Sequence, residues 1–88
     1  MRVMQQIDKR FKAKLKIRKH LIARNFWEYY ITDMYPPDSD IQNAYVMGNF
    51  DEIGDVSLLE LKPFIISETE NLQDVAPATG WKWLDEEE

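Results

Sequence analysis

The sequence predicts an α+β fold with a basic N-terminal helix, about three antiparallel strands and one or two short helices. Three observations support this class. Residues 1–25 contain neither glycine nor proline and are rich in helix-forming residues. Aromatic and β-branched residues then crowd together at 26–32, as in strands. Two capping motifs, at Ser57 and Ser67, each have a glutamate three residues later and indicate helix starts.

The basic segment has two interpretations. Its apolar residues recur at helical spacing, which favours a helix: Ile7, Phe11, Leu15 and Ile22. From Phe11 to Arg18, however, apolar and basic residues alternate, which is typical of a strand with one basic face. We favour the helix and keep the strand as the alternative.

The aromatic run at 26–32 predicts a central strand covered on both faces. Its side chains divide between the two faces, with Trp27, Tyr29 and Ile31 on one and Phe26 and Tyr30 on the other. A loop with Pro36 and Pro37 follows. We expect further strands at 44–47 and 50–56, joined by a turn at Gly48 and Asn49.

The C-terminal third predicts short helices between apolar stretches. Ser57 opens a helix at 58–62 that Pro63 ends, and Ser67 precedes another helix before Pro77. The following residues are assigned to the core: Leu58, Leu61, Phe64 and Ile65. We assign Trp81 and Trp83 to the core as well, with an exposed binding anchor as the alternative.

Length and composition limit the class of protein. With 88 residues, 44% of them apolar, residues 1–88 suit a single small domain. There is no cysteine, which excludes disulfides and thiolate metal sites. No apolar run approaches the ~20 residues of a membrane span, and no signal peptide is recognisable. We expect a cytoplasmic protein without a membrane partner.

Charge divides the chain into three segments. Residues 1–24 hold nine of the eleven basic side chains and one acid, residues 25–84 form an acidic body, and residues 85–88 are an acidic tail. The first segment carries about +8 and the remainder about −13. Opposed fields of this size steer encounters with charged partners. The pattern therefore favours an interaction protein.

Catalytic signatures are missing from the sequence. His20 is the only histidine, and among its basic neighbours we expect it at the surface. Three glycines are too few for a phosphate-binding loop. A calcium loop beginning at Asp38 would need glycine and glutamate where the chain has Asn43 and Asn49. We predict no catalytic residue, no metal site and no cofactor, and hence no enzyme.

Two binding surfaces remain as candidates. The acidic body predicts a partner-binding site at the following residues: Asp51, Glu52, Asp55, Trp81 and Trp83. The basic segment predicts, as the alternative, phosphate contacts to nucleic acid through Lys12, Lys14, Lys16, Arg18 and Lys19. Carboxylates spread over a compact surface can imitate a nucleic-acid backbone and occupy a basic groove on a protein.

One stretch of the sequence resembles a known family. Residues 25–63 read NFWEYYITDMYPPDSDIQNAYVMGNFDEIGDVSLLELKP. The matching elements are Trp27 to Asp33, Ala44 to Gly48 and Glu52 to Leu61, and they are similar to small uncharacterised proteins encoded on bacterial plasmids and phages. The resemblance implies an origin on a mobile element and carries over no functional residue.

Together these observations predict a non-enzymatic protein-binding module with an acidic surface. Its most concrete form is a phage- or plasmid-type inhibitor of a host nucleic-acid enzyme, of the anti-CRISPR kind, that acts as a DNA mimic. The partner would be a protein, with a second copy of the chain as another candidate. A nucleic-acid-binding regulator is the alternative function.

Overall fold

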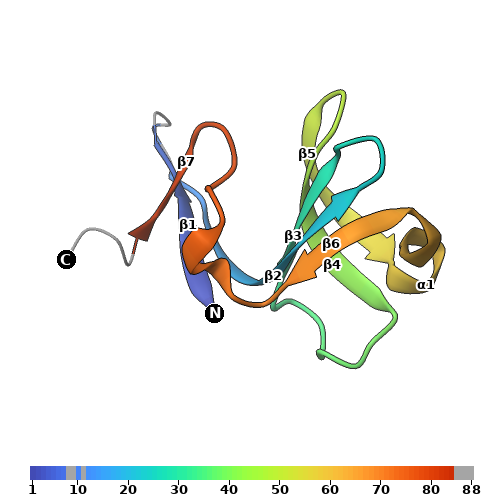
Figure 1. The fold of residues 1–88 in the computed structure, drawn as a ribbon. Coiled ribbons are helices and arrows are strands. Elements are labelled where there is room, and N and C mark those ends of the chain that lie inside the picture. Colours follow the sequence, from blue (N-terminus) through green and yellow to red (C-terminus); the bar gives the residue numbers. More distant parts are fainter. Residues whose placement is uncertain (8–9, 11, 85–88) are drawn as a thin grey trace.

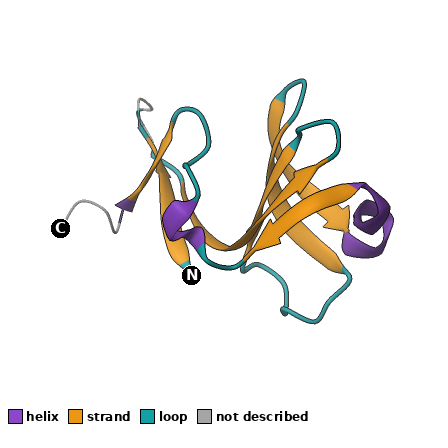
Figure 2. Cartoon of the chain, in the orientation of Figure 1, coloured by secondary structure: helices purple, strands orange, loops and turns teal. Residues whose placement is uncertain are grey.

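The computed structural model describes residues 1–7, 10 and 12–84. Within these residues, seven strands join in one antiparallel sheet, and helix is confined to short turns (Figure 2). The predicted α+β class is therefore wrong, because the described part of the chain is mainly β. Phe11 and the predicted acidic tail at 85–88 lie outside the described residues.

The strands follow the order β5-β4-β3-β2-β1-β7 across the sheet, and β6 also pairs with β2. Their bounds are β1 Arg2–Gln6, β2 Lys14–Ala23, β3 Glu28–Thr32, β4 Ile41–Met47, β5 Asp51–Ser57, β6 Ile65–Thr69 and β7 Trp81–Trp83. Helical turns lie at α1 Leu58–Leu61, η1 Lys62–Phe64 and η2 Leu72–Asp74. Figure 1 shows β1 and β7 at one end and β3 to β6 with α1 at the other, with β2 running through both.

The predicted N-terminal helix is wrong, since β1 and β2 occupy that segment. The strand alternative is confirmed from Lys14 onward. Met4 pairs with Leu15 across the two strands, and Met4 and Ile17 are completely buried. Pairing with distant strands buries these residues more fully than a helix interrupted by basic side chains would, so tertiary contacts override the helix propensity.

A β-bulge in β2 changes which side chains face which side of the sheet. Ile17 pairs with Thr32 and Lys19 with Ile31, so Arg18 is an extra residue without a counterpart on β3. Before the bulge, the side chains of Leu15 and Ile17 point to one face of the sheet. After the bulge, the side chain of His20 points to that same face. A one-residue shift of this kind exchanges the faces of every later residue in the strand.

Each face of the sheet carries its own core. The first core consists of Met4, Ile17, Tyr30, Tyr45, Leu72, Ala78, Trp81 and Trp83. The second core consists of Leu21, Ala23, Tyr29, Ile31, Ala44 and Val46. Tyr30 pairs with Tyr45 on one face, and Tyr29 with Val46 on the other. The prediction of a central aromatic strand covered on both faces is confirmed for β3.

Phe26 departs from this prediction. It lies in the turn between β2 and β3 with φ at 68°, and 78% of its surface is exposed. The amide of Phe26 donates to the carbonyl of Ala23 at 2.8 Å, which closes the turn. A tight turn requires left-handed backbone there, and this removes the side chain from the strand.

The first predicted helix start is confirmed and the second is wrong. Ser57 caps α1, where its hydroxyl accepts from the amide of Glu60 at 3.3 Å. Ser67 instead lies within β6 and pairs with Ile22. Asn71 caps the later turn η2, accepting from the amide of Gln73 at 3.3 Å. The strand pairing of β6 outweighs the local capping signal at Ser67.

Candidate functional site

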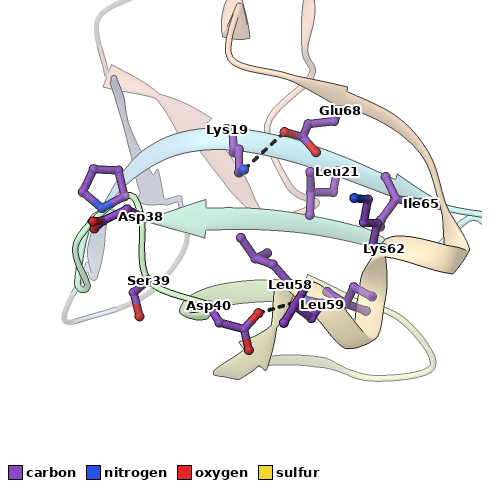
Figure 3. A pocket seen from close by; sticks show the side chains of 12 residues that line it. Lys19, Leu21, Asp38, Ser39, Asp40, Leu58, Leu59, Lys62, Ile65 and Glu68 are labelled. Carbon is purple, nitrogen blue, oxygen red and sulfur yellow. Dashed lines mark hydrogen bonds and ion pairs between the residues drawn. The ribbon is translucent and has the colours of Figure 1, made fainter.

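A groove of about 680 Å³ opens on the second-core side of the β2–β6 pair. One wall consists of α1, the opposite wall is the loop that precedes β4, and the floor lies between them (Figure 3). Leu21 and Glu68, which pair across β2 and β6, belong to the floor and rim. The groove therefore combines three segments that are far apart in the sequence.

Aliphatic side chains of α1, β2 and β6 line the groove. Leu58, Leu61 and Ile65 are half-buried and pack against the second core. Leu59 is 72% exposed, and Phe64, which does not line the groove, is 50% exposed. The prediction that Leu58, Leu61, Phe64 and Ile65 are core residues is wrong for Phe64 and holds only at the margin of the core for the others. So small a sheet cannot cover all of its apolar surface.

Charged side chains stand on the rim. The Nζ of Lys19 lies 3.2 Å from the Oε2 of Glu68 (Figure 3). The side chain of Glu68 is 56% exposed and that of Lys19 only 19%. Pairs this accessible contribute little to stability. Asp38 and Lys62 are exposed on the same rim.

Asp40 joins the two walls of the groove. Its carboxylate accepts from the Ser57 hydroxyl at 2.7 Å and from the Leu59 amide at 2.9 Å. The hydrogen bond from Ser57, followed by that from the Leu59 amide, lowers the pKa of the Asp40 carboxyl. The ionised side chain therefore holds α1 against the loop that precedes β4.

The three predicted acids lie on β5, which among the described strands pairs with β4 alone and so is an edge strand. Asp51 and Asp55 share one face, whereas Glu52 points to the other. Asp55 accepts from the hydroxyl of Tyr35 at 2.8 Å, and this hydrogen bond raises the pKa of the Tyr35 phenol. Charges on an edge strand also prevent pairing with other sheets.

The two predicted tryptophans lie in the core. Trp81 is 5% and Trp83 1% exposed, which confirms the core interpretation. The Nε1 of Trp83 donates to the carbonyl of Val75 at 2.8 Å. Neither ring is available as an exposed anchor. The structure does bring Trp81 together with Asp51 and Glu52, which line one cavity of about 520 Å³, whereas Trp83 and Asp55 do not line it.

Three of the five basic candidates are exposed, and the other two contact other parts of the protein. Lys12, Lys14 and Lys16 are exposed. Arg18 is half-buried, and its guanidinium donates to the carbonyl of Tyr35 at 3.0 Å and to the Gln42 side chain at 3.3 Å. Arg18 therefore fixes the loop before β4, and Lys19 pairs with Glu68.

Sequence reasoning missed a polar cluster around His20. The prediction of a surface histidine is wrong, because His20 is 5% exposed within β2. Its Nε2 lies 2.8 Å from the Oε1 of Glu28, and its ring lies 4.7 Å from that of Tyr30. A single acid within an aromatic strand was the one local signal of this cluster, since a partly buried carboxylate favours a polar partner.

Comparisons with known proteins leave the family open. No protein-family model, curated protein or solved structure matches the chain. The described residues contain no helix long and apolar enough to cross a membrane. They also contain no group of three or more metal-binding side chains arranged to hold an ion.

Proposed function

We propose that the protein is a non-enzymatic interaction module that binds an apolar segment of a protein partner in the groove between α1 and the loop that precedes β4. The observation that carries this proposal is the accessible aliphatic lining of the groove. Leu58, Leu61 and Ile65 are only partly covered, and Leu59 is mostly exposed. Covering such surface contributes about 25 cal/mol per Å² removed from water.

The size and shape of the groove suit side chains of a partner. A volume of about 680 Å³ lies within the usual range of ligand sites, which is roughly 300–1,000 Å³. Its walls hold their positions through Asp40, which bonds to both Ser57 and Leu59. A preformed groove lowers the ordering cost of binding.

Charge favours a partner segment that is basic as well as apolar. Acids outnumber cations around the groove: Asp38, Asp40 and Glu68 line it and Glu60 lies on α1, against Lys19 and Lys62. Acidic surroundings attract cationic partners and accelerate association. One interaction module of this kind would be an inhibitor that mimics the charge of nucleic acid and so blocks a nucleic-acid enzyme. This more specific function stays a prediction.

A peptide selection tests the groove. Selecting a random peptide library on the wild-type protein should enrich sequences that combine apolar and basic residues, and Leu59→Asp should weaken their binding at least about tenfold. Phe50→Asp is the matched control, since Phe50 is 84% exposed and does not line the groove. Equal binding by wild type and Leu59→Asp, measured by fluorescence anisotropy, would reject the groove as the site.

Charge reversal tests the mimicry version separately. Replacing Asp51, Glu52 and Asp55 by lysine should abolish binding to a basic nucleic-acid enzyme while peptides in the groove still bind. The variant must first show the thermal unfolding midpoint of the wild type, because Asp55 and Asp51 accept hydrogen bonds from Tyr35 and Tyr45. Unchanged capture of the enzyme by a folded variant would reject mimicry through β5.

A further inference from the structure

A second cavity, of about 400 Å³, opens on the opposite face of the β2–β6 pair. Residues of these strands alternate between the two hollows: Leu21 and Glu68 face the groove, while His20 and Thr69 face the cavity. The segment that includes η2 closes its far side with Asp74. The cavity is thus separate from the groove assigned to the partner.

The donor and acceptor roles of His20 follow from its contact with Glu28. A carboxylate only accepts hydrogen bonds, so in the neutral imidazole the Nε2 that lies 2.8 Å from Glu28 carries the hydrogen. The Nδ1 is then an acceptor. No described residue pairs with Nδ1, and no side-chain nitrogen or oxygen of the described chain is both buried and unpaired. Nδ1 therefore keeps some accessible surface in this 5% exposed residue, and His20 lines the cavity.

The aromatic neighbour of His20 fixes the position of the ring. Tyr30 packs against the imidazole at 4.7 Å, and its hydroxyl donates to the carbonyl of Ala76 at 2.8 Å. Burial, together with the nearby Glu28 carboxylate, raises the pKa of the Tyr30 phenol, so it stays protonated. The His20 ring is therefore held in place before a ligand arrives.

The walls of the cavity attract cations. Glu28 and Asp74 contribute carboxylates, and the described residues that line the cavity include no lysine or arginine. Glu28 uses only its Oε1 in the contacts with His20 and Tyr30, which leaves its Oε2 for a ligand. An anion would be repelled by both carboxylates. A metal ion is disfavoured, because the described side chains do not converge as three metal-binding groups.

We propose that this cavity binds a guanidinium group, either on an arginine side chain of a polypeptide or on a small guanidino compound. A guanidinium is planar, always charged and has five N–H donors, which match two carboxylates and the Nδ1 acceptor. An ammonium ion has a compact, strongly hydrated charge and satisfies fewer fixed acceptors at once. This assignment is independent of the groove and its partner.

Titration followed by NMR tests the proposal with three probes: ethylguanidinium, ethylammonium and N-acetyl-arginine methylamide. Ethylguanidinium should shift the His20 ring nitrogens and the Ser67 and Thr69 amides saturably, with millimolar affinity. Asp74→Asn should weaken binding at least about threefold and Glu28→Gln about tenfold, because each removes a carboxylate. Glu60→Gln is the control, since this exposed acid on α1 does not line the cavity.

Several outcomes would overturn the assignment. These are the absence of saturable shifts up to about 50 mM ethylguanidinium, equal binding of ethylammonium, or equal weakening by Glu60→Gln. The Asp74→Asn arm keeps the test valid if Glu28→Gln disturbs the fold, because Asp74 is exposed. Tighter binding of N-acetyl-arginine methylamide than of ethylguanidinium supports a polypeptide source, and the reverse supports a free guanidino compound.

Discussion

The indole of Trp27 packs directly on the backbone of Gly48, and a Cβ added to Gly48 would lie 2.7 Å from the ring. This contact is at the end of the β3–β4 ladder, where Glu28 pairs with Met47. Gly48→Ala forces the indole or the turn to move. We expect a loss of about 1–3 kcal/mol in the free energy of unfolding, measured by urea denaturation.

Gly54 provides the control for this substitution. A Cβ there meets nothing within 4 Å, so Gly54→Ala should change stability by less than about 0.5 kcal/mol or increase it slightly. If the two variants lose the same stability, close packing against Trp27 is not the reason for glycine at position 48.

Stability should depend on pH through Asp40. Its pKa is lower in the folded protein than in the unfolded chain, so its contacts stabilise the fold above the unfolded value of about 3.9. This stabilisation is lost as the pH falls through the lower folded-state pKa. Asp40→Asn should lower the urea midpoint at pH 7, and the difference from wild type should shrink below pH about 4.

The matched variant is Asp38→Asn in the same loop. Asp38 is exposed, and we expect its substitution to leave the urea midpoint nearly unchanged at pH 7. A difference between Asp40→Asn and wild type that persists unchanged from pH 7 to pH 2 would show that the charge of Asp40 is irrelevant.

Trp83 should contribute to stability as a core residue. Trp83→Phe removes the hydrogen bond to the Val75 carbonyl and leaves unfilled volume in the first core. We expect a loss of about 1–3 kcal/mol, measured by urea denaturation with circular dichroism. Phe50→Ser, at a position that is 84% exposed, should change stability by less than about 0.5 kcal/mol. Unchanged unfolding of Trp83→Phe would contradict the core assignment.

The alternative function predicts binding to nucleic acid through the exposed part of the basic segment. Lys12, Lys14 and Lys16 are its exposed members. If they contact phosphates, the protein should be retained on DNA or RNA at low salt and released as salt rises. Replacing the three lysines by glutamine should then reduce the salt slope of log K by about 2–3. Lys62→Gln is the control, and no retention of the wild type at about 50 mM salt excludes this function.

Local patterns predicted the middle of the fold well. The aromatic run that contains Tyr29 and Tyr30 forms β3, and the turn at Gly48 joins β4 and β5. The capping signal at Ser57 begins α1. In each case the decisive residues are neighbours in sequence, so alternation and turn chemistry contain enough information.

The N-terminal segment shows where local patterns fail. Its composition favours a helix, but β2 pairs with its sequence neighbours β1 and β3 and with β6, which several elements separate from it. The bulge at Arg18 exchanges the faces of the strand. As a result, the His20 side chain points to the same side of the sheet as the first core. Strict alternation along β2 would instead have placed it on the exposed face with Lys14 and Lys16.

The candidate groove was also beyond sequence reasoning. Leu21, Asp40 and Leu59 come from three segments that only the tertiary structure brings together. The sequence indicated acidic residues and apolar residues at the correct positions, including Leu58 and Ile65. It could not indicate that the sheet leaves these side chains partly uncovered, because burial depends on which elements pack above them.

The three partners of β2 have a kinetic consequence. In the sequence, β3, β4, β5 and α1 lie between β2 and its partner β6. Likewise, β1 and β7 pair although they lie at opposite ends of the described chain. Bringing these distant strands together costs conformational entropy in the intervening chain before their hydrogen bonds and contacts can stabilise the fold. We expect refolding on the millisecond-to-second scale typical of non-local β proteins, with unpaired strand edges exposed to aggregation during that interval.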